Sequence, residues 1–130
     1  MKIVLLMGAI FLCIACNSTH AQSSLYAAIK EVETGGGIKP GDQGMSNGPY
    51  QIQRAYWEDA CQYGGLDWEY SKYVNSEKYC RVIMDLYAQR YKARSDEERA
   101  KLHNGGPRWR KLPKVNKYWE KVERFLKEGL

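Results

Sequence analysis

The chain has 130 residues, of which 44% are hydrophobic, and its formal net charge at pH 7 is +5. This length and composition predict one globular domain and exclude an intrinsically disordered chain. The positive charge favours an anionic partner, but no helix-turn-helix, zinc-finger or RNA-binding signature is present, so we do not expect nucleic acid to be that partner.

The first 21 residues predict a secretory signal peptide. Lys2 is followed by an apolar run over residues 3–15, which is too short to span a membrane, and Thr19-His20-Ala21 offers a small-residue cleavage site. We therefore expect a signal peptide at 1–21 and a secreted, extracellular domain at 22–130, with no membrane attachment after cleavage. We also expect this domain to be a monomer.

Four cysteines are present, of which Cys13 and Cys16 lie in the signal peptide. Cys16 would mark a lipid-attached cysteine in a bacterial exporter, but a cysteine at position 13 replaces the expected leucine, which disfavours this alternative. Cys61 and Cys80 remain in the secreted domain. An oxidising compartment favours a disulfide between them over two free buried thiols.

The first helix is predicted to begin at Ser23 or Ser24 and to end before Gly35, because apolar residues repeat there at helical spacing. Glu33 therefore lies near the C-terminus of this helix. The loop over residues 35–49 contains six glycines and two prolines. This composition favours turns or a short antiparallel β element over a helix.

A helical pattern resumes at Gln51 and ends at Gly64, whereas residues 66–74 have no clear period and are expected to be irregular or single-turn structure. Asn75 or Ser76 caps the next predicted helix, which has the clearest amphipathic stripe and is expected to be the central buried helix. That stripe consists of Tyr79, Val82, Ile83, Leu86, Tyr87 and Tyr91.

Two more helices complete the predicted domain. Ser95-Asp96-Glu97-Glu98 fits a capping box, which begins a short helix that ends at Asn104-Gly105-Gly106-Pro107. After Pro113, apolar residues lie on one side of a final helix that ends at Gly129. With neither a repeat nor a linker, the sequence predicts an α+β fold that is mostly helical, with a small β-hairpin region.

Two carboxylates are candidates for acid–base chemistry. Glu33 lies just before the glycine-rich loop, and Asp42 lies within it. Cleavage of a glycosidic bond uses two carboxyl groups, one protonated to donate to the leaving oxygen and one ionised to meet the positive charge on the sugar. Apolar neighbours and the negative end of its helix favour the protonated form of Glu33. Asp42 lies among glycines in a polar loop and should stay charged.

Six segments of the chain resemble, in order, those of the invertebrate-type (destabilase-like) lysozymes. The two most unusual strings are HNGGP, at residues 103–107, and GPYQI-x-x-AYW, at residues 48–57. The resemblance covers nearly all of the chain after the signal peptide. Two features depart from the family pattern, namely a shorter loop around Asp42 and a lower cysteine content. The six segments are EVETG (31–35), GDQG (41–44), SNGPYQI (46–52), AYWED (55–59), YAQRY (87–91) and AKLHNGGP (100–107).

The resemblance implies a lysozyme-like domain with its β-hairpin next to the active-site cleft. The implied activity is that of a muramidase, which hydrolyses the β-1,4 bond between N-acetylmuramic acid and N-acetylglucosamine, with Glu33 as proton donor and Asp42 as nucleophile or electrostatic stabiliser. Bacterial peptidoglycan is the implied partner, in defence or digestion, and no cofactor or metal is expected. The residues implied to contact substrate are Gln53, Arg54, Ala55, Tyr56, Trp57, Glu58, Asp59, Tyr87, His103, Asn104 and Gly105.

Aromatic side chains suit a saccharide cleft, because sugar rings have flat apolar faces and polar rims. Helical spacing is equally consistent with core positions for such residues. The aromatic residues expected near a cleft are Tyr50, Tyr56, Trp57 and Tyr87, and those expected outside it are Trp109, Tyr118 and Trp119.

His103 is the only histidine of the predicted secreted domain, and the sequence supplies no partners for a metal site. We expect His103 to be a hydrogen-bonded structural residue, and its position within the HNGGP string predicts that it lines the cleft. A Ser46–His103 pair would be the candidate for an isopeptidase side activity, which some relatives are described as having. A basic run is expected to be solvated, with docking on the wall as the alternative, and comprises Arg108, Arg110, Lys111, Lys114 and Lys117.

Two further functions remain open from the sequence. The order of a glutamate, a glycine-rich loop and GPYQI also resembles lytic transglycosylases, in which one glutamate works without an aspartate and leaves anhydro-sugar ends. A non-enzymatic wall-binding protein would keep the fold while the shortened loop removes the chemistry.

Overall fold

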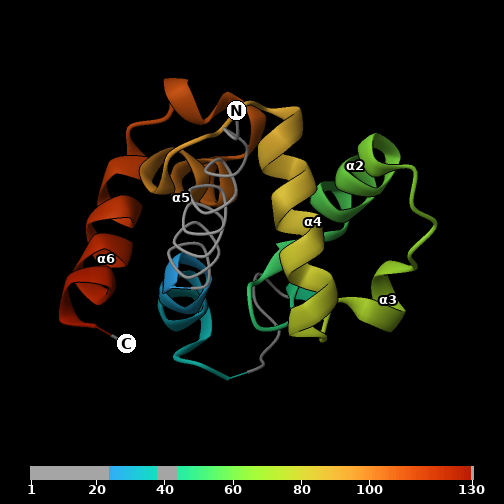
Figure 1. Ribbon diagram of the computed structural model, residues 1–130, viewed down its shortest axis with the longest axis horizontal. Coiled ribbons are helices and arrows are strands. Elements are labelled where there is room, and N and C mark those ends of the chain that lie inside the picture. Colours follow the sequence, from blue (N-terminus) through green and yellow to red (C-terminus); the bar gives the residue numbers. More distant parts are fainter. Residues whose placement is uncertain (1–23, 38–43, 130) are drawn as a thin grey trace, which may run out of the picture.

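The computed structural model describes residues 24–37 and 44–129, so the predicted signal peptide and Asp42 lie outside the described residues. The first described helix, called helix 24–34 below, precedes the elements named next, of which Figure 1 labels the helices α2 to α6. In chain order these elements are β1 (Ser46–Asn47), β2 (Ile52–Gln53), α2 (Arg54–Gly64), α3 (Tyr70–Tyr73), α4 (Glu77–Arg90), α5 (Asp96–Gly105), the 3₁₀ helix η2 (Gly106–Lys111) and α6 (Lys114–Glu128). This mostly helical arrangement with one small antiparallel sheet confirms the predicted fold class. No described helix is long and apolar enough to cross a membrane.

The β-hairpin pairs β1 with β2 in antiparallel register, with Ser46 opposite Gln53. The expectation that a helix resumes at Gln51 was wrong, because residues 48–51 form the turn that connects the two strands. Gln51 has a left-handed backbone there, with a φ of 51°, which a helix does not accept. Helix α2 therefore begins only at Arg54, after the second strand.

Helix α4 lies between α2 and α5 in Figure 1 and packs against both, as expected of the central helix. Its buried side is nevertheless rotated from the predicted stripe. Val82 is 37% exposed, whereas Cys80 and Met84 are buried. Tyr79 was included in the predicted apolar stripe, but it is only partly buried and its ring stacks on Tyr73 at the edge of the core. The observed buried side follows helical spacing and consists of Cys80, Ile83, Met84, Tyr87 and Ala88.

The predicted capping box begins α5. Oγ of Ser95 accepts a hydrogen bond from the backbone N–H of Glu98 at 3.1 Å, and the Glu98 carboxylate accepts one from the backbone N–H of Ser95 at 3.4 Å. Helix α5 ends at Gly105, close to the predicted position, and η2, which the sequence did not predict, leads into α6. Helix α6 packs against α5 and buries Val115, Tyr118 and Val122.

Cys61 and Cys80 are free, buried thiols, so the predicted disulfide between them was wrong. Each thiol has its own backbone partner: Sγ of Cys80 donates to the carbonyl of Val74 at 3.0 Å, and Sγ of Cys61 faces the carbonyl of Trp68 at 3.8 Å. Burial raises the pKa of both thiols, that of Cys80 to about 12. With no disulfide between these cysteines, the fold is stabilised by a packed core, which includes Leu25, Ile29, Tyr50, Trp57, Ile83, Leu102 and Val122.

Candidate active site

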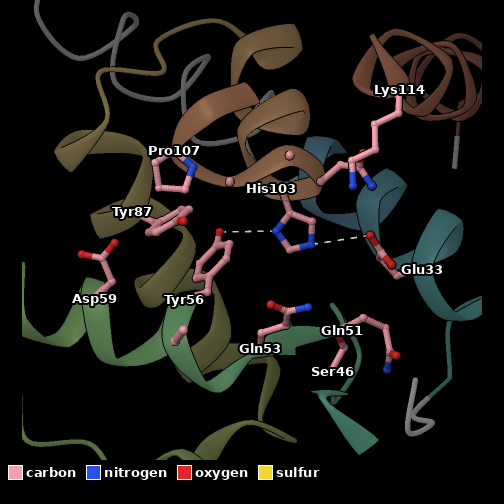
Figure 2. Close-up of a pocket in the computed structure, with 14 residues that line it drawn as sticks. Glu33, Ser46, Gln51, Gln53, Tyr56, Asp59, Tyr87, His103, Pro107 and Lys114 are labelled. Carbon is pink, nitrogen blue, oxygen red and sulfur yellow. Dashed lines mark hydrogen bonds and ion pairs between the residues drawn. The ribbon is translucent and has the colours of Figure 1, made fainter. Parts of the chain in front are cut away.

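A cleft of about 620 Å³ lies where helix 24–34, the hairpin, α2, α4, α5 and the start of α6 meet (Figure 2). This volume is in the range of small-molecule and saccharide sites. The described residues that line it are Glu33, Ser46, Gln51, Gln53, Ala55, Tyr56, Asp59, Tyr87, His103, Asn104, Gly105, Gly106, Pro107 and Lys114.

Glu33 lies one residue before the last described residue of helix 24–34, which agrees with its predicted place near a helix end. Its side chain is 20% exposed, and Oε1 accepts a hydrogen bond from the hydroxyl of Tyr118 at 2.8 Å. The hydroxyl of Thr34, the next residue, donates a hydrogen bond to the carbonyl oxygen of Pro49 at 3.2 Å and joins this helix end to the hairpin turn. Tyr118 therefore holds the carboxylate of Glu33 at the wall of the cleft, while Thr34 fixes the helix end that carries it.

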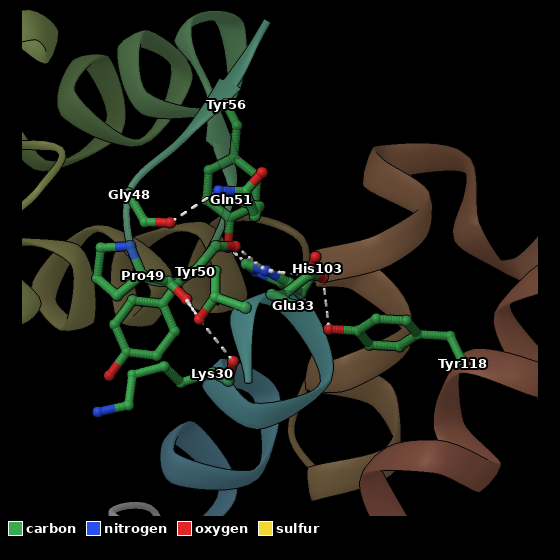
Figure 3. A network of polar contacts seen from close by, with 10 residues as sticks. Lys30, Glu33, Gly48, Pro49, Tyr50, Gln51, Tyr56, His103 and Tyr118 are labelled. Carbon is green, nitrogen blue, oxygen red and sulfur yellow. Dashed lines mark hydrogen bonds and ion pairs between the residues drawn. The ribbon is translucent and has the colours of Figure 1, made fainter. Parts of the chain in front are cut away.

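His103 is buried between Glu33 and the hairpin turn, with a side chain that is 3% exposed. Nε2 lies 2.8 Å from the carbonyl oxygen of Tyr50, which can only accept, so Nε2 carries the hydrogen. Nδ1 then accepts from the hydroxyl of Tyr56 at 3.3 Å. Burial lowers the pKa of His103 from 6.5, although Glu33 and the Tyr50 carbonyl oppose this in part. The neutral ring thus anchors α5 to the hairpin turn and α2 (Figure 3).

Tyr56 and Tyr87 form an aromatic wall of the cleft. Their rings stack with centroids 3.7 Å apart and planes inclined by 19°. Burial raises the pKa of both phenols, so each keeps its proton and can donate a hydrogen bond. Asp59 lies beyond this pair, at the opposite end of the cleft from Glu33 in Figure 2. Arg90 forms an ion pair with Asp59 at 2.5 Å, which balances its charge.

The structure brings eight of the eleven predicted substrate-contacting residues together in the cleft with Glu33. Trp57 is fully buried, and its indole N–H donates to the carbonyl of Trp68 at 2.7 Å. Arg54 and Glu58 lie on the exposed side of α2, where they form an ion pair at 3.7 Å. These three do not line the cleft, because consecutive residues of a helix point in different directions. The eight that do are Gln53, Ala55, Tyr56, Asp59, Tyr87, His103, Asn104 and Gly105.

Several lining residues were not predicted as substrate contacts. Gln51, Gly106 and Pro107 belong to the two strings that carried the family resemblance, which was the signal that could have found them. Tyr118 lies outside the cleft lining, as expected, but its hydroxyl holds Glu33, which was not predicted. No local pattern marks Tyr118 for this contact. Tyr50, in contrast, was expected near the cleft but is fully buried beneath it.

Two other kinds of chemistry receive no geometric support. Among the described residues, no group of three histidine, cysteine or acidic side chains is placed to hold a metal ion. Ser46 and His103 both line the cleft, but both ring nitrogens of His103 already face Tyr50 and Tyr56. The Ser46–His103 pair therefore lacks a free base for nucleophilic catalysis.

Comparison with known proteins shows that the chain is similar to lysozymes. No known family model matches the chain. It is 36% identical over 83 residues to Lysozyme 1 of Crassostrea virginica, covering 60% of this chain and 44% of that protein. It is 34% identical over 84 residues to the invertebrate-type lysozyme of Ruditapes philippinarum, covering 62% and 61%. The chain thus spans less than two thirds of either relative. The inhibitor-bound lysozyme from Meretrix lusoria superposes with a TM-score of 0.57 at 30% identity, covering 78% of this chain and 87% of that one.

Proposed function

Because this chain belongs to the invertebrate-type lysozyme family, we propose that it is a secreted muramidase of bacterial peptidoglycan, acting in defence or digestion. It would hydrolyse the β-1,4 bond between N-acetylmuramic acid and N-acetylglucosamine, with Glu33 as general acid and Asp42 as nucleophile or electrostatic stabiliser. One observation carries the proposal: the Glu33 carboxylate lies at the wall of a cleft of about 620 Å³ and is held there by Tyr118.

The contacts of Glu33 fit the role of proton donor. Oε1 accepts the hydrogen bond from Tyr118, and we assign the proton that Glu33 donates to Oε2. In the reaction this proton passes to the glycosidic oxygen as the bond to the sugar breaks. The positive charge that grows on the sugar is then met by the second carboxylate, for which we propose Asp42, and water adds to the sugar to complete the hydrolysis.

The rest of the cleft suits a chain of amino sugars. The stacked rings of Tyr56 and Tyr87 line the cleft and provide apolar surface for a sugar. The amide side chains of Gln51, Gln53 and Asn104 line the same cleft and can both donate to and accept from hydroxyl and acetamido groups. No cofactor enters the proposed mechanism.

The test is the clearing of a bacterial wall suspension by the wild type and the variants Glu33→Gln and Asp42→Asn. We expect Glu33→Gln to abolish clearing and Asp42→Asn to reduce it strongly. Glu31→Gln makes the same chemical change two residues earlier in helix 24–34, outside the cleft lining, and should clear normally. Folding of each variant is checked by circular dichroism.

The products separate the proposal from its alternatives. A hydrolase leaves reducing sugar ends, whereas a lytic transglycosylase leaves anhydro ends and does not require Asp42. Normal clearing by Asp42→Asn, with anhydro ends in the products, would therefore replace the two-carboxylate mechanism by a one-glutamate mechanism. Wild-type protein that binds peptidoglycan without any clearing would favour the non-enzymatic binding protein.

A further inference from the structure

Lys114, the first residue of α6, places a positive charge in the cleft. Among the described residues that line the cleft, it is the only lysine or arginine. Its side chain is exposed, and it takes part in none of the ion pairs between described residues. In Figure 2, Lys114 and Glu33 come from the same side of the cleft, opposite Asp59 and Tyr87.

The other ionisable groups in the lining have partners within the protein. Asp59 forms its ion pair with Arg90 at 2.5 Å, and Glu33 accepts the hydroxyl of Tyr118. The ring of His103 is held neutral by burial, which lowers its pKa. The ammonium group of Lys114 is therefore the cationic charge of the described cleft lining that is available to a ligand.

The position of Lys114 in its helix is unfavourable for stability. The N-terminus of a helix carries the positive end of the macrodipole, which disfavours a cation in the first turn. The first turn of α6 contains no acidic residue, and Pro113 supplies no capping side chain. No acidic or capping residue of α6 itself thus offsets the positive potential at this helix end. An anionic group of a ligand would do so.

We infer that Lys114 is a specificity-determining residue that binds a carboxylate carried by the substrate sugar. This inference rests on the proposed function. In wall glycan, the carboxylate belongs to the lactyl arm of N-acetylmuramic acid, either as the lactyl group itself or on the stem peptide attached to it. Chitin has the same glycosidic bond and acetamido groups but no carboxylate. Lys114 therefore makes the cleft prefer wall glycan to chitin.

Binding measurements in the full-length Glu33→Gln chain test the inference without turnover. Three soluble probes of equal sugar length are compared: a neutral oligomer of N-acetylglucosamine, the alternating wall glycan without stem peptides, and the same glycan with stem peptides. We expect Lys114→Gln to weaken binding of a charged probe about three- to tenfold and to leave the neutral probe unchanged. An effect on the peptide-free glycan assigns the lactyl carboxylate, and an effect confined to the peptide-bearing glycan assigns the stem.

Two further variants make the result specific. Lys114→Arg keeps the charge and should restore most of the affinity for the charged probe. Lys121→Gln removes an equal charge from an exposed position further along α6, outside the cleft, and should leave all three affinities unchanged. Added salt should weaken binding of the charged probe less in Lys114→Gln than in the parent chain.

Equal affinities of the parent chain and Lys114→Gln for all three probes would overturn the inference, as would an equal loss for charged and neutral probes. Failure of the proposed function has a different signature, because it appears as a wild-type chain that does not clear wall suspensions. If the wild type clears walls but Lys114→Gln binds every probe as tightly as the parent chain, the proposed function stands and the inference about Lys114 is wrong.

Discussion

The hydroxyl of Tyr118 on α6 donates a hydrogen bond to Oε1 of Glu33 at 2.8 Å, across 85 positions of sequence. Tyr118 is 7% exposed, and its burial together with the nearby Glu33 carboxylate raises the pKa of the phenol well above its ordinary value. The phenol therefore keeps its proton and acts as the donor. One carboxylate oxygen is fixed in this way, and the candidate acid is oriented by the last helix of the chain.

Replacing Tyr118 by phenylalanine should remove this orientation while keeping the ring in the core. We expect kcat on soluble wall glycan to fall roughly tenfold with little change in KM, because misplacement of an acid affects the reaction more than binding. The free energy of unfolding should fall by about 0.5–1.5 kcal/mol, the typical net contribution of a hydrogen bond. An unchanged kcat in a stable variant would show that Tyr118 has only a structural role.

Because His103 is buried, we expect the free energy of unfolding to depend on pH. Because burial lowers the pKa of His103 from 6.5, the folded state binds this proton less readily than the unfolded state. His103 therefore contributes stability that is fully present above pH 6.5 and is lost as the pH falls from 6.5 through the folded-state pKa. Within that window the loss approaches about 1.4 kcal/mol per pH unit.

Urea unfolding from neutral pH into the acid range measures this component. The variant His103→Gln has no charge to gain, so its stability should fall less steeply than that of the wild type below pH 6.5. Parallel curves for the two proteins would contradict the buried neutral assignment.

The hairpin turn predicts a strong glycine requirement at one position. A Cβ at Gly48 would lie 2.1 Å from the carbonyl oxygen of Val74, and the backbone φ is +78°. We expect Gly48→Ala to lower the free energy of unfolding by roughly 2–4 kcal/mol, because steric clash and left-handed strain add. Gly65→Ala is the control, since Gly65 has a φ of +65° but open space around it; it should lose only about 1 kcal/mol. If the two variants lose equal free energy of unfolding, the backbone at Val74 moves away from the new Cβ at little energetic cost.

The free thiols predict redox-independent stability. Without reductant, denatured protein should give Cys61 and Cys80 peptides that are both alkylated by iodoacetamide in mass spectrometry. In the native state alkylation should be slow, because burial raises the pKa of both thiols and shields them. Adding reductant should leave the thermal unfolding midpoint unchanged. Recovery of a Cys61–Cys80 cross-linked peptide would restore the disulfide that the sequence suggested.

Local patterns predicted local features well. The capping box at Ser95 and the end of the first helix beside Glu33 depend on residues a few positions apart, and both are present. The family strings led to most of the cleft lining, because they contain the hairpin turn and the end of α5. The same strings predicted too many substrate-contacting residues in α2, because helical geometry directs the side chain of Trp57 into the core.

The sequence by itself determined the mostly helical fold with one hairpin, the helix boundaries set by caps and glycines, and Glu33 as a carboxylate at a helix end. Only the tertiary structure decided that Tyr118 holds that carboxylate, that Lys114 enters the cleft, and that the two cysteines stay apart. The reason is physical. Caps and periodicity act within one or two turns of chain, whereas these contacts depend on how α6 and α4 pack against elements far away in sequence.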